Sequence, residues 1–261
     1  MSITFCILGS GSSGNSTYIG SGSTAILIDA GFSGRDTARR LEQINLLPDN
    51  ITAICLTHEH SDHTAGLRVL CERHGIKPYA NRGTIDALSV ADPRLNSLNW
   101  NVFLTGSRFK IGTLTIEPFS VPHDAYDPVG FIISSDTAKL GIVTDMGMPT
   151  HLIKEKLKDC HALIVESNHD IDLLQTANRP WQVKQRIAGR QGHLCNEKAA
   201  EMICEIAGSH LTHVFLSHLS NDCNTPELAH DCMSAALKKN GLQNIDVHLS
   251  FPDKISNICN I

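Results

Sequence analysis

The six residues HEHSDH at positions 58–63 constrain this chain more than any other segment. They follow an apolar run, ITAICLT, which is typical of a buried strand. Imidazole and carboxylate groups are good ligands for divalent zinc, manganese or iron. Alternation along an extended backbone puts His58 and His60 on one side, so both can reach the same ion. Asp62 and His63 then turn away and can begin a second site, so the segment predicts metal ligands at a strand end.

Three more candidate ligands follow strand-like apolar runs further along the chain. His123 ends FSVPH, Asp145 ends KLGIVTD and His218 ends HVFLSH. Taken alone, a histidine at a strand end is more often a hydrogen-bonded surface group. Taken together, strand ends that gather at one edge of a sheet favour a shared site for these three residues.

The apolar spacing alternates between strand and helix periods along the chain. Helices are predicted over 34–46, 64–74, 84–90, 149–158, 181–188, 196–207 and 226–240. Strands are predicted at 3–8, 24–29, 51–57, 78–80, 162–166, 213–217 and 246–251, with several more between 102 and 143 and a tail after 251. Antiparallel-looking strands flanked by helices in both halves indicate an α/β fold with two packed sheets and helices outside. We see no internal linker and expect a single domain over residues 1–261.

The segment GSGSSG at positions 9–14 matches the dinucleotide-binding pattern G-x-G-x-x-G. Such a site needs a helix directly after the glycines, to hold the pyrophosphate at its N-terminus. Here only nine residues separate Gly14 from Thr24, too few for a crossover helix with its loops. We interpret the segment as a tight loop between antiparallel strands, whose small residues let the backbone approach a neighbouring site.

Charge and cysteine content limit the class of protein. A net charge of −5 argues against polyanion binding by the whole surface, although it is compatible with a local basic patch. The nine cysteines include no C-x-x-C pair, and the N-terminus carries no signal-peptide pattern. No apolar run is long enough to span a bilayer. We therefore expect a soluble cytoplasmic protein with reduced thiols and no membrane partner.

The ligand pattern resembles the metallo-β-lactamase fold superfamily, whose signature is H-x-H-x-D-H. The segment Asp29-Ala30-Gly31 is similar to that family's early strand end. The resemblance implies a four-layer αββα sandwich of two mixed sheets, with the site along one edge of the sheets. It also implies how the ligands are divided: His58, His60 and His123 on one metal, Asp62, His63 and His218 on the second, and Asp145 bridging both.

The resemblance further implies hydrolysis by two divalent ions, zinc, manganese or iron, that hold a bridging hydroxide as the nucleophile. The same ions would neutralise charge building on a phosphoryl or carbonyl oxygen. No segment supplies a flavin domain, which disfavours a redox member of the superfamily. The true lactamases often carry cysteine where this chain has Asp145, so antibiotic hydrolysis is not expected.

Two more segments, ESNHD at 166–170 and GHLCN at 192–196, are similar to the phosphodiesterase branch that includes RNase Z. The similarity implies that His193 is a general acid oriented by Glu166, and we expect Asp62 to serve catalysis as well. Alternatively, His193 simply caps the helix that starts near Asn196. The basic segment 179–190, with four cations and Trp181, is either a contact to phosphates or an ordinary solvated helix face.

Within the superfamily the chain is most similar to the YycJ/WalJ group. The matching segments are LGSGSSGNS at 8–16, LTHEHSDHTAGL at 56–67, PHDAYDPVGF at 122–131, TDMG at 144–147, GHLCNEKAA at 192–200 and SHLSNDCNTPELA at 217–229. The group implies a bacterial 5′-to-3′ exonuclease on DNA with a link to mismatch repair. Asn224, near the last ligand, is suited either to a phosphate contact or to helix capping before Pro226.

The expected function is a dinuclear metal-dependent phosphodiesterase, most simply a DNA exonuclease whose partner is nucleic acid. One alternative is a small-molecule phosphodiesterase, or a thioester or lactone hydrolase. Another is a metal-binding regulatory protein without turnover. The residues leave the choice of metal and the oligomeric state open.

Overall fold

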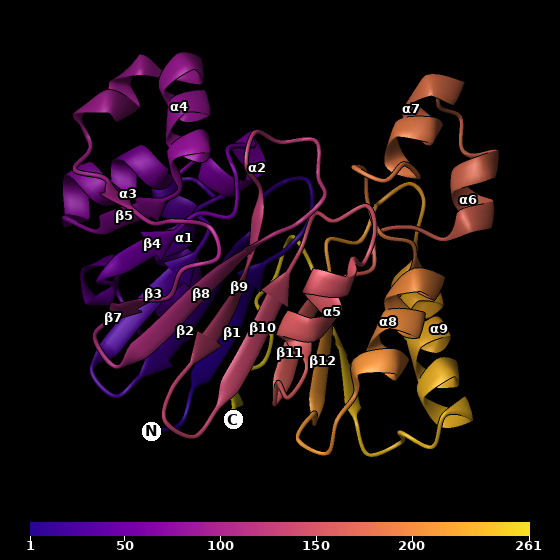
Figure 1. Ribbon diagram of the computed structural model, residues 1–261. Helices are drawn as coiled ribbons and strands as arrows, with labels where there is room; N and C mark the ends of the chain where they lie inside the picture. The colour runs from indigo at the N-terminus through magenta and orange to yellow at the C-terminus, as the bar shows by residue number, and fades with distance from the viewer.

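Two seven-stranded mixed sheets pack face to face in the computed structural model, which describes residues 1–261 (Figure 1). The first sheet has the order β14-β1-β2-β3-β4-β5-β6 and the second β13-β12-β11-β10-β9-β8-β7. Helices lie on the outer face of each sheet, so the predicted four-layer αββα sandwich is confirmed.

The first sheet begins antiparallel and becomes parallel. Its strands are β1 (Thr4–Gly9), β2 (Ser16–Ser21), β3 (Thr24–Ile28), β4 (Ala53–Cys55), β5 (Lys77–Ala80), β6 (Asn101–Val102) and β14 (Cys259–Asn260). Strands β1, β2 and β3 pair antiparallel, and β3 to β6 pair parallel. Because β1 and β2 form a hairpin, the glycine-rich loop between them cannot be a dinucleotide fingerprint.

The second sheet shows the same change of direction. Its strands are β7 (Phe109–Ile111), β8 (Leu114–Ser120), β9 (Val129–Ser134), β10 (Lys139–Val143), β11 (Ala162–Glu166), β12 (His213–Ser217) and β13 (Asp246–Leu249). Strands β7 to β10 pair antiparallel, whereas β10 to β13 pair parallel. Antiparallel strands were expected in both halves of the chain; each sheet does contain them, but the rest of each sheet is parallel.

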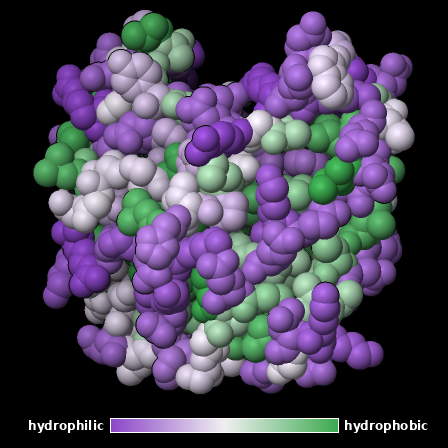
Figure 2. Space-filling view, turned by 45° about the vertical axis from the view of Figure 1, so that its right-hand side comes forward, coloured by the Kyte–Doolittle hydropathy of each residue, from purple (hydrophilic) through white to green (hydrophobic).

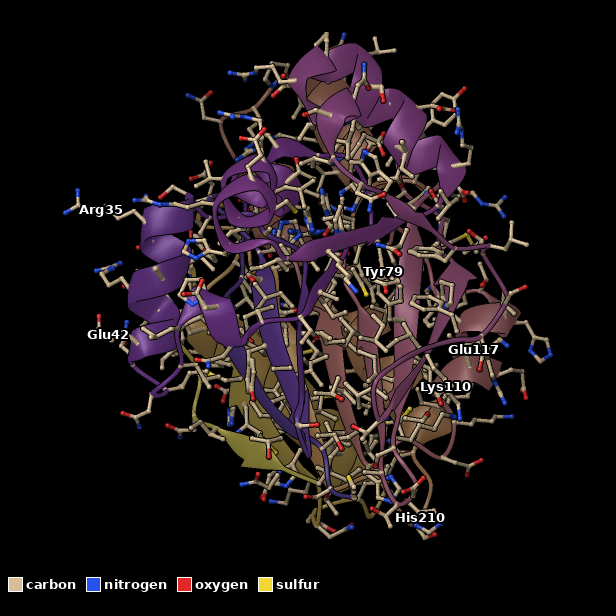
Figure 3. The ribbon with its side chains drawn as sticks, turned by 90° about the vertical axis from the view of Figure 1, so that its left-hand side faces the viewer. Arg35, Glu42, Tyr79, Lys110, Glu117 and His210 are labelled. Atoms are coloured by element: carbon tan, nitrogen blue, oxygen red, sulfur yellow. The ribbon has the colours of Figure 1, made fainter.

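The helices are amphipathic and several are capped by their own sequence. They are α1 (Gly34–Glu42), α2 (Ser61–Thr64), α3 (Leu67–His74), α4 (Arg82–Ala91), α5 (His151–Leu157), α6 (Ile171–Thr176), α7 (Trp181–Ile187), α8 (Asn196–Ile206) and α9 (Pro226–Lys239), with 3₁₀ turns η1 (Pro48–Asn50) and η2 (Pro93–Ser97). The side chains of Ser33, Asn81, Thr150 and Thr225 accept backbone N–H groups at the starts of α1, α4, α5 and α9. In Figure 3, Arg35 and Glu42 of α1 project away from the sheets.

Three apolar layers result from this arrangement. The layer between the sheets includes Phe5, Phe131 and Phe215, and all three side chains are almost completely buried. A second layer joins the first sheet to α1, α3 and α4, and a third joins the second sheet to α5, α8 and α9. Successive strand residues enter opposite layers, as Phe215 and Leu216 do, because side chains alternate across a strand.

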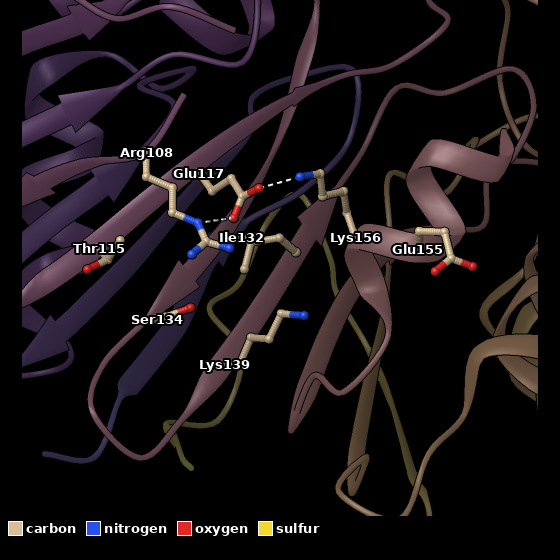
Figure 4. A pocket seen from close by; sticks show the side chains of 8 residues that line it. All are labelled: Arg108, Thr115, Glu117, Ile132, Ser134, Lys139, Glu155 and Lys156. Carbon is tan, nitrogen blue, oxygen red and sulfur yellow. Dashed lines mark hydrogen bonds and ion pairs between the residues drawn. The ribbon is translucent and has the colours of Figure 1, made fainter. Parts of the chain in front are cut away.

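One part of the second sheet's outer face is covered by charges instead of apolar side chains. Glu117 of β8 accepts a hydrogen bond from Arg108 at 2.7 Å and is paired with Lys156 of α5 (Figure 4). These residues line a cavity of about 500 Å³ together with Lys139 and Ser134.

The structure bears on the state of the cysteines and on the length of the apolar helices. All nine cysteines are free thiols. None of the helices combines the length and the apolar character that crossing a membrane would require.

Candidate metal centre

The predicted ligands meet where strands of both sheets end, at the edge next to α2 (Figure 1). Asp29 follows β3, Asp145 closely follows β10 and His218 follows β12. All three have positive φ angles, of 62°, 53° and 55°. A non-glycine residue in this region carries strain, and such strain gathers at functional sites. The strand ends are therefore bent to aim these side chains inward.

The first cluster consists of His58, His60 and His123, whose ligand atoms all lie within 4.8 Å of one another. His123 Nε2 lies 3.4 Å from His60 Nδ1. His123 Nδ1 donates to the carbonyl oxygen of Gly192 at 3.2 Å, and this tautomer leaves Nε2 free as a ligand. Burial, with repulsion from His63, holds the pKa of His58 well below its ordinary value, so that imidazole is neutral.

The second cluster is centred on Asp145. Its Oδ2 lies 3.1 Å from His63 Nε2, and its Oδ1 lies 2.9 Å from His218 Nδ1. Asp62 Oδ2 lies 3.6 Å from His63 Nε2 and 3.8 Å from His218 Nε2. His58, His63 and Asp145 also form a group within 4.8 Å. Asp145 thus lies between the two clusters, where a bridging ligand would be needed.

Within the two clusters, three buried ligand-type atoms have no hydrogen-bond partner: His58 Nε2, Asp145 Oδ2 and His218 Nε2. A buried polar atom without a partner costs about 1–3 kcal/mol, so such atoms call for an explanation. Imidazole nitrogen and carboxylate oxygen are the donors that zinc, manganese and iron accept. The His and Asp clusters fit a dinuclear metal site.

The histidine His63 is held from behind by Asp29. Its Nδ1 donates to Asp29 Oδ2 at 2.8 Å, and Asp29 also accepts from the backbone N–H and the hydroxyl of Thr57. Burial alone would lower the pKa of His63, but the carboxylates of Asp29 and Asp145 outweigh burial and raise it to about 10. This carboxylate–histidine pairing is typical of the support behind a metal ligand.

Sequence reasoning did not identify two residues of the glycine-rich loop that reach this cluster. The Asn15 side-chain amide donates to Asp62 Oδ2 at 3.2 Å and lies 3.1 Å from His63 Nε2. Ser10 donates its hydroxyl to Asn15 Oδ1 and accepts the backbone N–H of His218. The signal was the polar run SGSSGN, residues 10–15, within the predicted loop. The expected close approach of this loop to a site is confirmed.

His193 lies beside the second cluster, and its Nδ1 donates to Glu166 Oε1 at 2.6 Å. Glu166 is fully buried at the end of β11, and its other oxygen accepts the backbone N–H groups of Met146 and Leu194. Burial would raise the pKa of Glu166, but the His193 ring lowers it to about 2. In turn, Glu166 overcomes the effect of burial and raises the pKa of His193.

The alternative interpretation, in which His193 caps α8, is wrong because the capping position belongs to Cys195 and has no side-chain hydrogen bond. His193 and Glu166 also form a group with Asp145 and His218 within 4.8 Å. Glu166 and His193 are therefore close enough to Asp145 and His218 to act on the same bound ion or substrate.

Asn224 does not face the site, so the expected phosphate contact is wrong. It is buried and donates to the carbonyls of Ser167 and Asn168 at 2.9 and 3.0 Å. The capping alternative is also wrong in detail, since Thr225 caps α9. Asn224 instead joins the segments after β11 and β12.

A cavity of about 220 Å³ opens beside His193. Its lining residues are Ser12, Asp124, Asn168, Arg179, Val183, Arg186, Ile187, Gly192, His193 and Ser220. The helix α7 contributes to its wall, and Figure 2 shows a hollow between this lobe and the lobe of α4, with largely hydrophilic surroundings. Within the basic segment, Arg186 is paired with Asp124 at 2.6 Å and Arg179 with Asp222, while Trp181 remains 65% exposed.

The fold and the paired His and Asp clusters define a metal-dependent hydrolase of the metallo-β-lactamase fold. The family model "Beta-lactamase superfamily domain" matches residues 24–219. Exodeoxyribonuclease YycJ from Bacillus anthracis is 35% identical over 92% of this chain and 91% of its own length. Exodeoxyribonuclease WalJ from Streptococcus pneumoniae is 36% identical over 88% of this chain and 86% of its own. The chain therefore belongs to the beta-lactamase superfamily and, within it, to the group of YycJ and WalJ.

A solved structure with the same fold is the metallo-beta-lactamase fold protein YhfI from Bacillus subtilis. It has a TM-score of 0.76 and 15% sequence identity, and the match covers 100% of this chain and 99% of that one. This likeness shows the fold alone.

Proposed function

We propose that the protein is a metal-dependent phosphodiesterase that degrades DNA from its 5′ end. The observation that carries the proposal is the hydrogen bond from His193 to the buried Glu166, beside two clusters of His and Asp side chains. The exodeoxyribonuclease names of YycJ and WalJ, which match nearly the whole chain, support DNA as the substrate. We also propose a cytoplasmic location, which agrees with the nine free thiols. We further propose that residues 1–261 form a single domain, because both sheets contribute side chains to one apolar layer.

In this proposal His58, His60 and His123 would hold one divalent cation, Asp62, His63 and His218 would hold another, and Asp145 could serve either. Two such cations, zinc, manganese or iron, would supply activated water and would neutralise charge on the phosphoryl oxygens. Asn15 and Asp29 keep Asp62 and His63 in position through the hydrogen bonds described above.

His193 serves as the general acid. Its Nδ1 is held by Glu166, so its Nε2 can carry the proton that the departing sugar oxygen needs. Glu166 stays ionised because its pKa is about 2, and it therefore favours the protonated imidazole. The side chain of His193 is 23% exposed and lines the cavity, which lets it reach a bound substrate.

The cavity wall suits a nucleic acid strand. Arg179 and Arg186 lie on it, and the exposed Trp181 ring at the start of α7 can stack on a base. Both arginines are already paired with aspartates, so their contribution to phosphate binding depends on exchanging those partners.

The test is cleavage of DNA labelled at its 5′ or its 3′ end, single-stranded and duplex, with Mn²⁺, Zn²⁺ or Fe²⁺ added to metal-free protein. We expect mononucleotides to be released first from the 5′-labelled end. Release of the 3′ label first would overturn the polarity. If the protein hydrolysed a small phosphodiester and did not cleave DNA, the small-molecule alternative would replace the proposal.

A further inference from the structure

A second group of metal-ligand side chains lies away from the candidate metal centre. His213, Asp246 and His248 offer three ligand atoms that all lie within 4.8 Å of one another. We propose that they form a separate site for a divalent transition metal, of the zinc type, which ties the edge strand β13 to β12. This site is independent of the proposed function.

The register of the two strands produces the group. Strands β12 and β13 are parallel, and His213 is paired with Asp246 while Phe215 is paired with His248. Asp246 and His248 are two residues apart on one strand, so their side chains point to the same face. His213 shares that face from the neighbouring strand, and the three side chains therefore converge.

The face in question is the one that points between the sheets. Val214, Leu216, Val247 and Leu249 pack into the outer layer against the helices, whereas Phe215 belongs to the layer between the sheets. Because β13 is the last strand of its sheet, this inner face is open to solvent at its rim. The His213 side chain is 25% exposed and that of Asp246 is 72% exposed. An ion can therefore enter from solvent.

The spacing of the ligand atoms suits a tetrahedral ion. Two nitrogens bound to zinc at about 2.0–2.1 Å lie roughly 3.3–3.4 Å apart at a tetrahedral angle. His213 Nδ1 and His248 Nε2 are 3.2 Å apart, and Asp246 Oδ2 is 3.8 Å from His213 Nδ1. The ring of His248 is stacked on Phe215, with centroids 4.4 Å apart, which fixes its direction. Three protein ligands leave one position for water.

This group cannot share ions with the candidate metal centre. His213 begins β12 and His218 follows its end. Five residues of extended chain span about 16 Å, so the two sites lie at opposite ends of the strand. An edge strand is a weak point for fraying and for unwanted pairing, and a metal held across β12 and β13 would restrain it.

The experiment is a Zn²⁺ titration of metal-free protein against a chromogenic chelator, with bound zinc counted after gel filtration. The two test variants are His248→Phe, which keeps the stack on Phe215, and Asp246→Asn at an exposed position. The control is His230→Phe on α9. His230 also has a carboxylate neighbour, with its Nδ1 3.5 Å from Asp231 Oδ1, but it belongs to no group of three possible ligands.

We expect His248→Phe to bind one zinc fewer than the unmodified protein, and Asp246→Asn to bind that zinc about tenfold or more weakly. DNA cleavage should stay unchanged in both variants. An equal zinc count in the unmodified protein and His248→Phe would overturn the proposal and leave a hydrogen-bonded imidazole pair. An equal loss in His230→Phe would also overturn it, because the binding would then be a general property of surface histidines.

Discussion

At the scale of single residues, the centre is built from positions that the backbone disfavours. Asp29, Asp145 and His218 are three of the five non-glycine residues with positive φ. Such a conformation costs about 1–2 kcal/mol at each position. The surrounding hydrogen bonds, such as the one from Ser10 to the His218 backbone, hold it in place. We infer that the strain is kept because it directs Asp145 and His218 into the centre and Asp29 towards His63.

His193 and Asp62 should separate catalysis from metal binding. In His193→Ala we expect bound metal to be retained and DNA cleavage to fall roughly 10²–10⁴-fold, the usual contribution of a general acid. In Asp62→Ala we expect one of the two metals to be lost. Metal content and initial rates measured on the same samples check both. Loss of metal from His193→Ala as well would make His193 a ligand, in agreement with its place near Asp145.

Gly31 marks a close approach between the loop after β3 and α2. A Cβ at this position would lie 1.7 Å from the backbone oxygen of Asp62 and 2.5 Å from the backbone nitrogen of Asn15. We expect Gly31→Ala to destabilise the protein by about 1–3 kcal/mol and to weaken metal binding, because Asp62 must move. Gly208→Ala, whose Cβ would meet only ordinary contacts, is the control. Equal denaturation midpoints for the two variants would contradict the expectation.

At the scale of elements, α7 and its flanks decide how the basic segment acts. Arg186 is unsuited to a simple test, because removing it also frees Asp124, which lies 3.3 Å from His123. We therefore choose Lys184→Ala with Arg190→Ala. If the segment contacts phosphates, the double variant should bind DNA more weakly and lower the slope of log K against log salt by about 1–2.

The matched control for this double variant is Lys238→Ala with Lys239→Ala at the end of α9, which removes the same charge elsewhere. Cleavage of a small phosphodiester should be unaffected in both. An equal change in DNA binding for the two double variants would point to overall charge rather than to a contact.

The charged patch on β8 predicts a pH dependence of stability. Burial opposes ionisation of Glu117, but Lys156 and Arg108 outweigh it, so its pKa lies below the ordinary 4.5. A lowered pKa in the folded state stabilises the protein above pH 4.5, and this contribution is lost as the pH falls through the folded value. We expect Glu117→Gln to cost about 1 kcal/mol at pH 7 and less at pH 3. Urea unfolding of both proteins at pH 7 and pH 3 checks this expectation. The same difference in the free energy of unfolding at the two pH values would contradict it.

Sequence patterns predicted the long helices well and the short elements poorly. The helices α8 and α9 and the strands β11 and β12 lie where apolar periodicity placed them. The helix α6 was missed because it has only six residues, and β14 because it has two and lies in the expected tail. The strand β14 exists only through its pairing with β1, which local periodicity does not report.

At the scale of the whole molecule, the proposed ligands join the two sheets at one edge. His58, His60 and His63 belong to the first sheet's side, and Asp145 and His218 belong to the second. Cations held between them should therefore stabilise the packing of the sheets, in addition to supporting turnover.

Removal of metal should lower the melting temperature. A cation at 100 times its Kd adds about 2.7 kcal/mol of stability. For a chain of this size that corresponds to a rise of roughly 5–10 °C. Thermal unfolding with a chelator, and then with Zn²⁺ or Mn²⁺ restored, checks the value. The control is Asp145→Asn. Its melting temperature should be the same with and without metal, because the substitution weakens the proposed shared ligand.

Residue types and local spacing indicated the kinds of side chain at the proposed metal centre and their place at strand ends. These features are local, since spacing and residue type act within a few positions. Which strand ends meet became evident only from the folded sheets. Asn15 reaches His63 across 48 positions, and Ser10 reaches His218 across 208. Such contacts depend on how the sheets pair and pack, which no local pattern encodes.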